Sequence, residues 1–342
     1  MERGAGVNNA YLTYAAKRLG QAAVVILLAY VFTFVVVSIL PGDPVTSVLR
    51  NPQNGFSEEQ IAEIIAAQGL DKPILVQLWN ALSGFLSGDL GVSMRSNRPV
   101  SILIAEVLPS TLILASAGLA VALVLAMAVA YGTRFVPKRY GQGLLRGFPS
   151  LFLSVPNFVI GLVLIHLFGF QLGLFRVINP DSFWATFFAA VALGIPISAQ
   201  IAEVLIANLD KEAEQEYATV ARSRGVGQAR LFATHLLKPA SLPVVTVIAL
   251  TIGELLGGSL ITETVYGRTG IGSLVQRSVS TQDLPVLQAV VSLGAVVFVI
   301  VNLIADLLYP LLDPRVKIIG GRKRVPTTAD EPSIGASKAV IS

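Results

Sequence analysis

The residue types that most often do chemistry in proteins are scarce in this chain. It has no cysteine and only two histidines, His166 and His235, so the clustered ligands of a thiolate or histidine metal site are missing. Residues 267–272 have the glycine spacing of a phosphate-binding loop, but Ser273 and Leu274 follow where that loop has Lys and Ser or Thr. We therefore expect no catalytic residue, no metal site and no bound ATP, and we interpret residues 267–272 as a turn.

One ionisable residue, Glu254, interrupts a long apolar run at residues 239–262. At 1.5 Å per residue it would lie roughly 22 Å along a helix that starts with the run, in the outer half of a membrane. Ionisable groups at that depth are costly and usually face water or a protein interior. Glu254 could receive a cationic group, bond to a second subunit, or be protonated. With Asn157, Gly257 and Gly258 it forms a tentative substrate pathway, although helix packing is the stronger interpretation of the two glycines.

A basic and largely polar stretch, residues 216–243, separates two long apolar runs. Its first part reads as a helix that contains Ala221 and ends near Gly225, and an amphipathic pattern then resumes. A short helix, a glycine break and a second amphipathic piece make a rigid knob that can insert into a groove on a soluble partner. Ala221 and Gly225 would be small because the knob must approach another backbone closely.

The polar side chains of this stretch have expected roles in the same contact. Arg222 and Arg224 could pair with acidic residues around the partner's groove, or they could reflect membrane topology or lipid headgroup contact. Tyr217 is expected to brace the knob against the membrane helices, and His235 to cap or brace it. These residues are our candidate site for contact with that partner.

Composition fixes the class of protein that must position these residues. Hydrophobic residues make up 54% of the 342 and charged residues 13%, with a mean hydropathy of +0.70, which is too apolar for one soluble core. Six windows reach the roughly 20 apolar residues that cross a bilayer. The fold class is therefore an all-α integral membrane protein with six transmembrane helices, and Pro156 and Pro196 predict kinks in two of them. The windows are residues 21–40, 111–133, 148–170, 182–202, 239–262 and 284–305.

The distribution of Lys and Arg sets the orientation, because positive residues accumulate on the cytoplasmic side. If the N-terminus is cytoplasmic, 18 of the 25 Lys and Arg residues fall inside. Both termini are then cytoplasmic, and so is the basic stretch.

These assignments divide the chain into successive parts. Within the external insertion Ser57 and Gln60 fit a helix capping box, and its helices either pack on the outer mouth or headgroups, or form a rim for an external partner or substrate. The parts are a cytoplasmic segment 1–20, a first transmembrane helix 21–40, an extracytoplasmic helical insertion 41–109, a core of five helices 110–312 with a coupling loop 208–238, and a tail 313–342 expected to be disordered.

Several motifs in order resemble one family, the permease subunits of bacterial ABC importers for peptides, opines and nickel. The resemblance covers residues 12–318 and is to the B-type subunit, which has the large external loop. Ala221 and Gly225 occupy the third and seventh places of its EAA loop, while Thr219 and Val220 depart from it. The other matching motifs are LPGDP at 40–44, LGVSM at 90–94, SVPNF at 154–158, ETVY at 263–266 and LDPRV at 312–316.

The resemblance implies a type I importer permease fold in a bacterial inner membrane and transport by alternating access. It implies a heterodimer with a second permease, two ATP-binding subunits that carry ATP and Mg, an external solute-binding protein, contact with lipid and no nucleic acid. The ATP-binding subunits would couple to this chain through Tyr217, Ala221, Arg222, Arg224, Gly225 and His235. This chain would bind no cofactor. Peptides are the favoured cargo, and Glu254 could receive their amino terminus or a cationic side chain; nickel chelates, glutathione or haem are the alternatives. A secondary transporter without an ATPase is the rival class.

Overall fold

Long apolar helices dominate the computed structural model, which describes residues 2–39, 57–69 and 71–312. Five helices are long and apolar enough to span a membrane, and a bent pair of shorter helices supplies a sixth if it counts as one span. The expected all-α membrane fold is confirmed, and within the described residues the only β pairing is an isolated bridge between Val92 and Pro99. The long helices are α1 (Glu2–Ile39), α5 (Val100–Phe135), α8 (Phe183–Ala213), α11 (Leu237–Tyr266) and α13 (Leu284–Leu312).

The third predicted span is broken in the structure. Helix α6 (Gln142–Leu153) and the segment formed by α7 (Asn157–Leu164) with the π-helix η3 (Ile165–Gln171) meet at 108°. The kink predicted at Pro156 is confirmed and is sharp enough to break the span, because Pro156 offers no N–H to the preceding turn and disfavours helical geometry in the residue before it. Pro196, in contrast, lies inside α8, which continues past it.

Two helices begin earlier than their apolar windows. Helix α1 starts at Glu2 rather than at residue 21, and α5 starts at Val100 rather than at residue 111. Counting apolar residues finds the part of a helix that fits the bilayer, whereas the hydrogen-bonded helix continues into its polar flanks.

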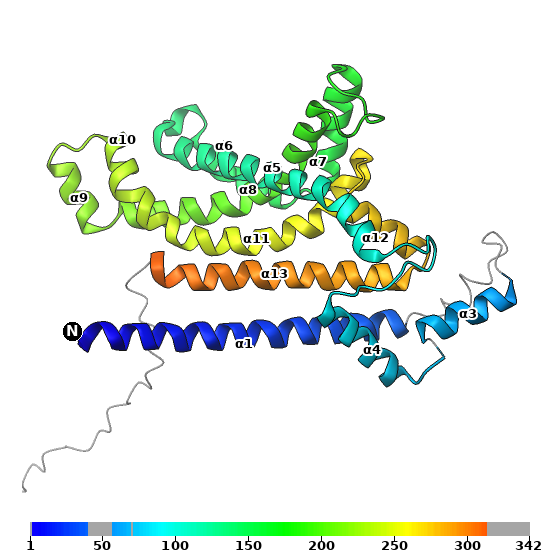
Figure 1. Cartoon of the computed structure of the whole chain (residues 1–342). Coiled ribbons are helices and arrows are strands. Elements are labelled where there is room, and N and C mark those ends of the chain that lie inside the picture. Colours follow the sequence, from blue (N-terminus) through cyan, green and yellow to red (C-terminus); the bar gives the residue numbers. More distant parts are fainter. Residues whose placement is uncertain (1, 40–56, 70, 313–342) are drawn as a thin grey trace, which may run out of the picture.

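Helix α8 forms the centre of the bundle and packs against α5 and α11. Small residues let α5 and α8 approach closely: a Cβ on Gly194 would lie 2.7 Å from the carbonyl oxygen of Gly118. Helix α1 lies along α13 at the periphery (Figure 1). There Phe32 is 70% exposed, as expected of a side chain that faces lipid.

The elements outside the bundle gather at its two ends (Figure 1). Helices α3 (Glu58–Gln68), α4 (Ile74–Ser87) and α12 (Ile271–Ser280) lie at one end. Helices α9 (Glu216–Ser223) and α10 (Gln228–Leu231), with the π-helix η4 (Phe232–Leu236), lie at the other, where α1 begins. A short 3-10 helix, η2 (Lys138–Tyr140), joins α5 to α6.

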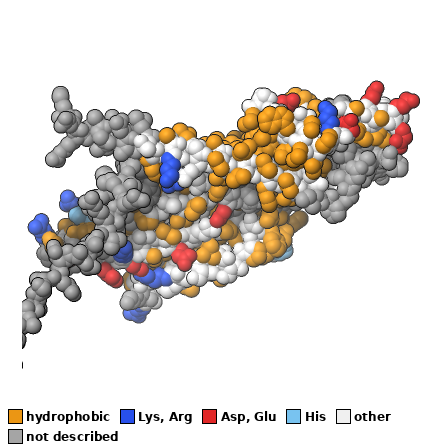
Figure 2. Space-filling view, turned by 90° about the horizontal axis from the view of Figure 1, so that it is seen from below, with side chains coloured by type: hydrophobic (Ala, Val, Ile, Leu, Met, Phe, Trp, Pro, Cys, Tyr) orange, Lys and Arg blue, Asp and Glu red, His pale blue; other side chains and the backbone are white. Residues whose placement is uncertain are grey.

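Side-chain types follow the same division. Figure 2 shows hydrophobic side chains over the middle of the visible face and charged ones mainly toward its ends. The predicted capping box is confirmed, since Gln60 N–H donates to Ser57 Oγ and Ser57 N–H donates to Gln60 Oε1. The LPGDP and LDPRV motifs, apart from Leu312 of the latter, and the tail 313–342 lie outside the described residues.

Candidate coupling site

Helices α9 and α10 form an elbow that protrudes from one end of the bundle (Figure 1). On α9, Ala218 and Ala221 are buried in the protein's own core. Gly225 follows at a φ of 78°, where a Cβ would meet no atom within 4 Å. The small size of Ala221 therefore serves packing within this chain, and glycine at position 225 supplies a left-handed conformation that closes the helix. Close approach of a partner's backbone, the other expected reason for small residues here, concerns a second chain and stays a prediction.

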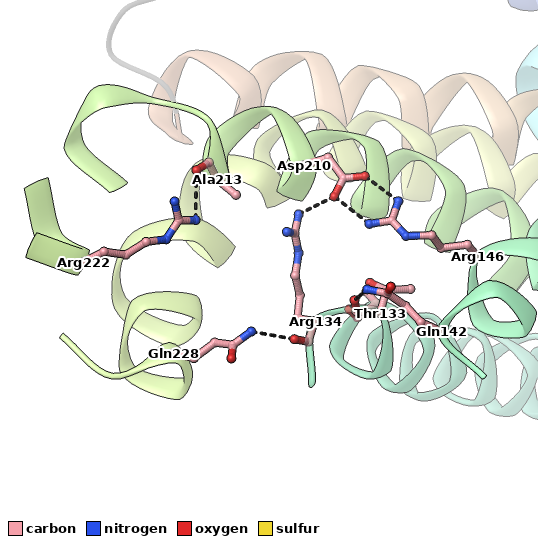
Figure 3. A network of polar contacts seen from close by, with 9 residues as sticks. Thr133, Arg134, Gln142, Arg146, Asp210, Ala213, Arg222 and Gln228 are labelled. Atoms are coloured by element: carbon pink, nitrogen blue, oxygen red, sulfur yellow. Dashed lines mark hydrogen bonds and ion pairs between the residues drawn. The ribbon is translucent and has the colours of Figure 1, made fainter. Parts of the chain in front are cut away.

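A network of ion pairs fixes the base of the elbow (Figure 3). Arg134 at the end of α5 donates to Asp210 of α8 at 2.7 Å, and Arg146 of α6 donates to the same carboxylate at 2.8 Å. Both arginines are held by one acid, so the ends of three bundle helices are tied together. Charge-assisted hydrogen bonds of this kind are stronger than neutral ones.

Two further hydrogen bonds connect the elbow to this network. Arg222 of α9 donates to the carbonyl oxygen of Ala213 at 3.0 Å, and Gln228 of α10 donates to the carbonyl oxygen of Arg134 at 2.6 Å (Figure 3). Both partners are backbone atoms at the ends of membrane helices. A displacement of the elbow would therefore pull directly on α8 and α5.

The remaining predicted coupling residues lie on the elbow or beside it. The Tyr217 hydroxyl donates to Glu212 at the end of α8. The pKa of Tyr217 is raised to about 12, mainly by desolvation and in smaller part by the hydrogen bond to Glu212 and its negative charge. Tyr217 therefore stays a protonated donor at physiological pH. Arg224 is exposed, and His235 Nδ1 lies 2.6 Å from Thr234 Oγ1.

The tentative pathway residues divide into two environments. Glu254 is exposed on α11 and accepts a hydrogen bond from Gln200 of α8 at 2.8 Å, and Gly257 lies one turn along the same open face. Gly258 instead faces the core, where an added Cβ would lie 3.5 Å from Asn157 Nδ2. The structure thus brings Asn157 to Gly258 and leaves Glu254 and Gly257 on an uncovered face.

Sequence reasoning missed a buried polar cluster at the opposite end. Glu263 is fully buried, accepts from Thr111 Oγ1 at 2.6 Å and from the N–H of Gly272 at 2.8 Å, and so holds the start of α12. Arg268, 4% exposed, donates to the carbonyl oxygen of Pro180 at 2.6 Å. The sequence feature that could have indicated this buried cluster is the ETVY motif followed by a glycine-rich turn.

A second missed contact ties the external insertion to the bundle. Asp283, just before α13, accepts hydrogen bonds from the Ser93 hydroxyl and from the Met94 N–H at 3.1 Å, and both Asp283 and Ser93 are buried. The partners belong to the LGVSM motif, so this motif secures the insertion against the bundle. Separation by 190 residues hides such a pair from any local pattern.

Comparison with known proteins now decides the family. Residues 118–318 match the family model "Binding-protein-dependent transport system inner membrane component", and residues 11–115 match the N-terminal model of the same systems. The chain belongs to this family. It is the permease subunit of an ABC importer of the peptide, opine and nickel uptake group, and a multi-pass inner-membrane protein.

Curated relatives support this membership over nearly the whole chain. The glutathione transport system permease protein GsiC of Escherichia coli K12 is 32% identical over 307 residues, which cover 90% of this chain and 99% of the relative. GsiC of Shigella boydii matches to the same extent. The MetNI methionine ABC transporter in inward-facing conformations shares the fold, with a TM-score of 0.52 at 16% identity over 62% of this chain and 96% of that one.

Proposed function

We propose that this permease subunit is driven through its α9–α10 elbow by a cytoplasmic ATPase. The observation that carries the proposal is the pair of hydrogen bonds from Arg222 and Gln228 to the backbone ends of α8 and α5. They make the elbow a lever attached to the bundle instead of a free loop. The EAA-type loop at 208–238 would be the contact for the ATPase, with the exposed Arg224 available to its acidic residues.

The assembly we propose has a second permease, two ATP-binding subunits that carry ATP and Mg, and an external solute-binding protein. The exposed surface of helix α11 is the observation that favours a second permease subunit. It leaves an exposed stripe that includes Leu250, Glu254 and Ile261, and a carboxylate facing lipid would be costly. A partner subunit that covers this stripe would give Glu254 a polar environment along a shared pathway.

We also propose that both termini and the coupling loop are cytoplasmic. The elbow and the start of α1 lie at the same end of the bundle (Figure 1), and the count of Lys and Arg favours that end as the inside. The insertion 41–109 would then be external, and the core 110–312 would form half of the translocation pathway.

For cargo we propose peptides, including short modified ones. The curated relatives are named for glutathione, a modified tripeptide. A carboxylate on the proposed pathway suits the amino terminus that free peptides share. Nickel chelates and haem are the alternatives. The secondary-transporter alternative loses its basis with the family assignment.

The test is uptake by the assembled importer in proteoliposomes, with the external binding protein present. We expect ATP-dependent uptake of labelled di- or tripeptide that excess glutathione or unlabelled peptide reduces. Uptake without ATP, or uptake of nickel chelate or haem that peptides do not reduce, would contradict the proposal. A binding-protein mutant unable to hold cargo serves as the control for leakage.

A further inference from the structure

A cleft of about 240 Å³ lies inside the elbow, between it and the end of α5. Its volume is far above the roughly 15 Å³ that one water molecule requires. Two guanidinium groups and one amide stand among apolar side chains, and Figure 3 places these three polar side chains around the same opening. The lining residues are Arg134, Arg222, Val226, Gln228, Leu231, Phe232 and Leu236.

Positive charge exceeds negative charge around this cleft. Arg134 and Arg146 share the single carboxylate of Asp210, and Arg222 donates to an uncharged carbonyl oxygen. The cleft itself is lined by two guanidinium groups, the half-buried one of Arg134 and the exposed one of Arg222, and by no carboxylate. Such a lining attracts an anion.

The hydrogen-bonding capacity of the arginines is also incompletely used. The Nε of Arg134 is buried and has no hydrogen-bond partner, and the Arg134 side chain is 17% exposed. A buried donor without a partner costs free energy, although this nitrogen is closed to solvent and does not itself line the cleft. Carboxylate and phosphate oxygens both accept from guanidinium groups, and a phosphate presents three or four oxygens tetrahedrally, so it can meet two guanidinium groups that come from different sides.

We propose that this cleft binds a phosphate group, held by Arg134 and Arg222 with Gln228 beside them. The phosphate comes either from the headgroup of an anionic membrane lipid or from a soluble phosphate. The buried Leu231, Phe232 and Leu236 exclude water from one side of the cleft and strengthen the contact. Because Arg134 belongs to α5 and Arg222 to α9, the bound anion would join the elbow to the bundle at a third point.

The test uses the importer assembled with its partner subunits in nanodiscs of phosphatidylcholine, with or without phosphatidylglycerol. Native mass spectrometry measures retained phosphatidylglycerol. In discs of phosphatidylcholine alone, the shift in melting temperature on adding inorganic phosphate is compared with sodium chloride at matched ionic strength. Retained lipid identifies the headgroup as the source, and a phosphate-specific shift identifies the soluble anion.

Arg222→Gln should weaken the response by about ten-fold or more, since it removes one charged partner of the phosphate. Arg224→Gln is the matched control, because it changes the same charge on the same elbow outside the cleft. Val226→Trp fills the cleft while keeping both arginines and should also abolish the response, which separates anion binding from loss of the Arg222 hydrogen bond.

Three results would overturn the proposal. The first is that neither anion binds the unaltered importer. The second is that Arg224→Gln loses as much binding as Arg222→Gln, which would indicate surface charge alone. Binding seen only after the ATPase is removed would assign the cleft to the ATPase contact. Anion binding and ATP-dependent peptide uptake are separate readouts, so loss of anion binding with uptake intact rejects only the anion site, and loss of uptake with anion binding intact rejects only the proposed function.

Discussion

Replacing Gly225 separates two reasons for a glycine at the elbow. Its φ is 78°, and an added Cβ would meet nothing within 4 Å in this chain. The left-handed region is disfavoured by about 1–2 kcal/mol for a residue with a Cβ, and by less for Asn. Gly225→Ala should therefore shift the equilibrium away from the docked elbow by about 5–30-fold. Gly225→Asn should be milder although its side chain is larger.

The assay is ATP hydrolysis stimulated by the loaded binding protein, measured with the assembled importer in nanodiscs, alongside peptide uptake in proteoliposomes. We expect activity to fall in the order Gly225, Asn, Ala, with membrane insertion unchanged. If Asn is worse than Ala, a neighbouring subunit packs tightly on this position and size is the reason. If Ala matches the unaltered protein, the left-handed conformation has no role in coupling.

Three further predictions concern other parts of the structure. Asp210→Asn leaves two arginines without their carboxylate and should lower stability by about 1 kcal/mol, seen as a melting temperature about 2 °C lower; Asp181→Asn, at a 68% exposed side chain, should not. Gly272→Ala places a Cβ 2.2 Å from the Cα of Leu260 and should destabilise by about 1–3 kcal/mol, whereas Gly143→Ala, in open space on α6, should be neutral or stabilising. Glu254→Gln keeps the size of the side chain and removes its charge, and it should raise the KM for peptides; an unchanged KM would remove Glu254 from the pathway.

Local features of the fold could be predicted from sequence. The capping box at Ser57 depends on residues three positions apart, and the helix break at Gly225 depends on a single residue with special backbone freedom. The spans α8 and α13 follow from continuous apolar runs. Each of these signals is contained in a short window.

Features that depend on tertiary contact could not be predicted. The kink at Pro156 was predicted from the proline itself, but its size of 108° depends on how α6 and α7 each pack against α8. Asp210 was overlooked because its partners Arg134 and Arg146 come from other helices, 76 and 64 residues away. The burial of Ala221 likewise depends on the position of α9 against the bundle. Sequence alone indicated that the elbow exists, and the structure shows how it is fastened.

Cross-linking tests the central claim most directly, and the absence of cysteine in this chain makes single-cysteine variants clean. Val220, on α9, is 48% exposed, and Ala62, on α3 at the opposite end, is also exposed. Each is replaced by cysteine in a separate variant. We expect Val220→Cys to cross-link to a cysteine in the groove of the ATPase and to stop ATP-driven uptake, while Ala62→Cys does neither. Cross-linking of the ATPase to Ala62→Cys, or uninterrupted transport with α9 cross-linked, would contradict the account.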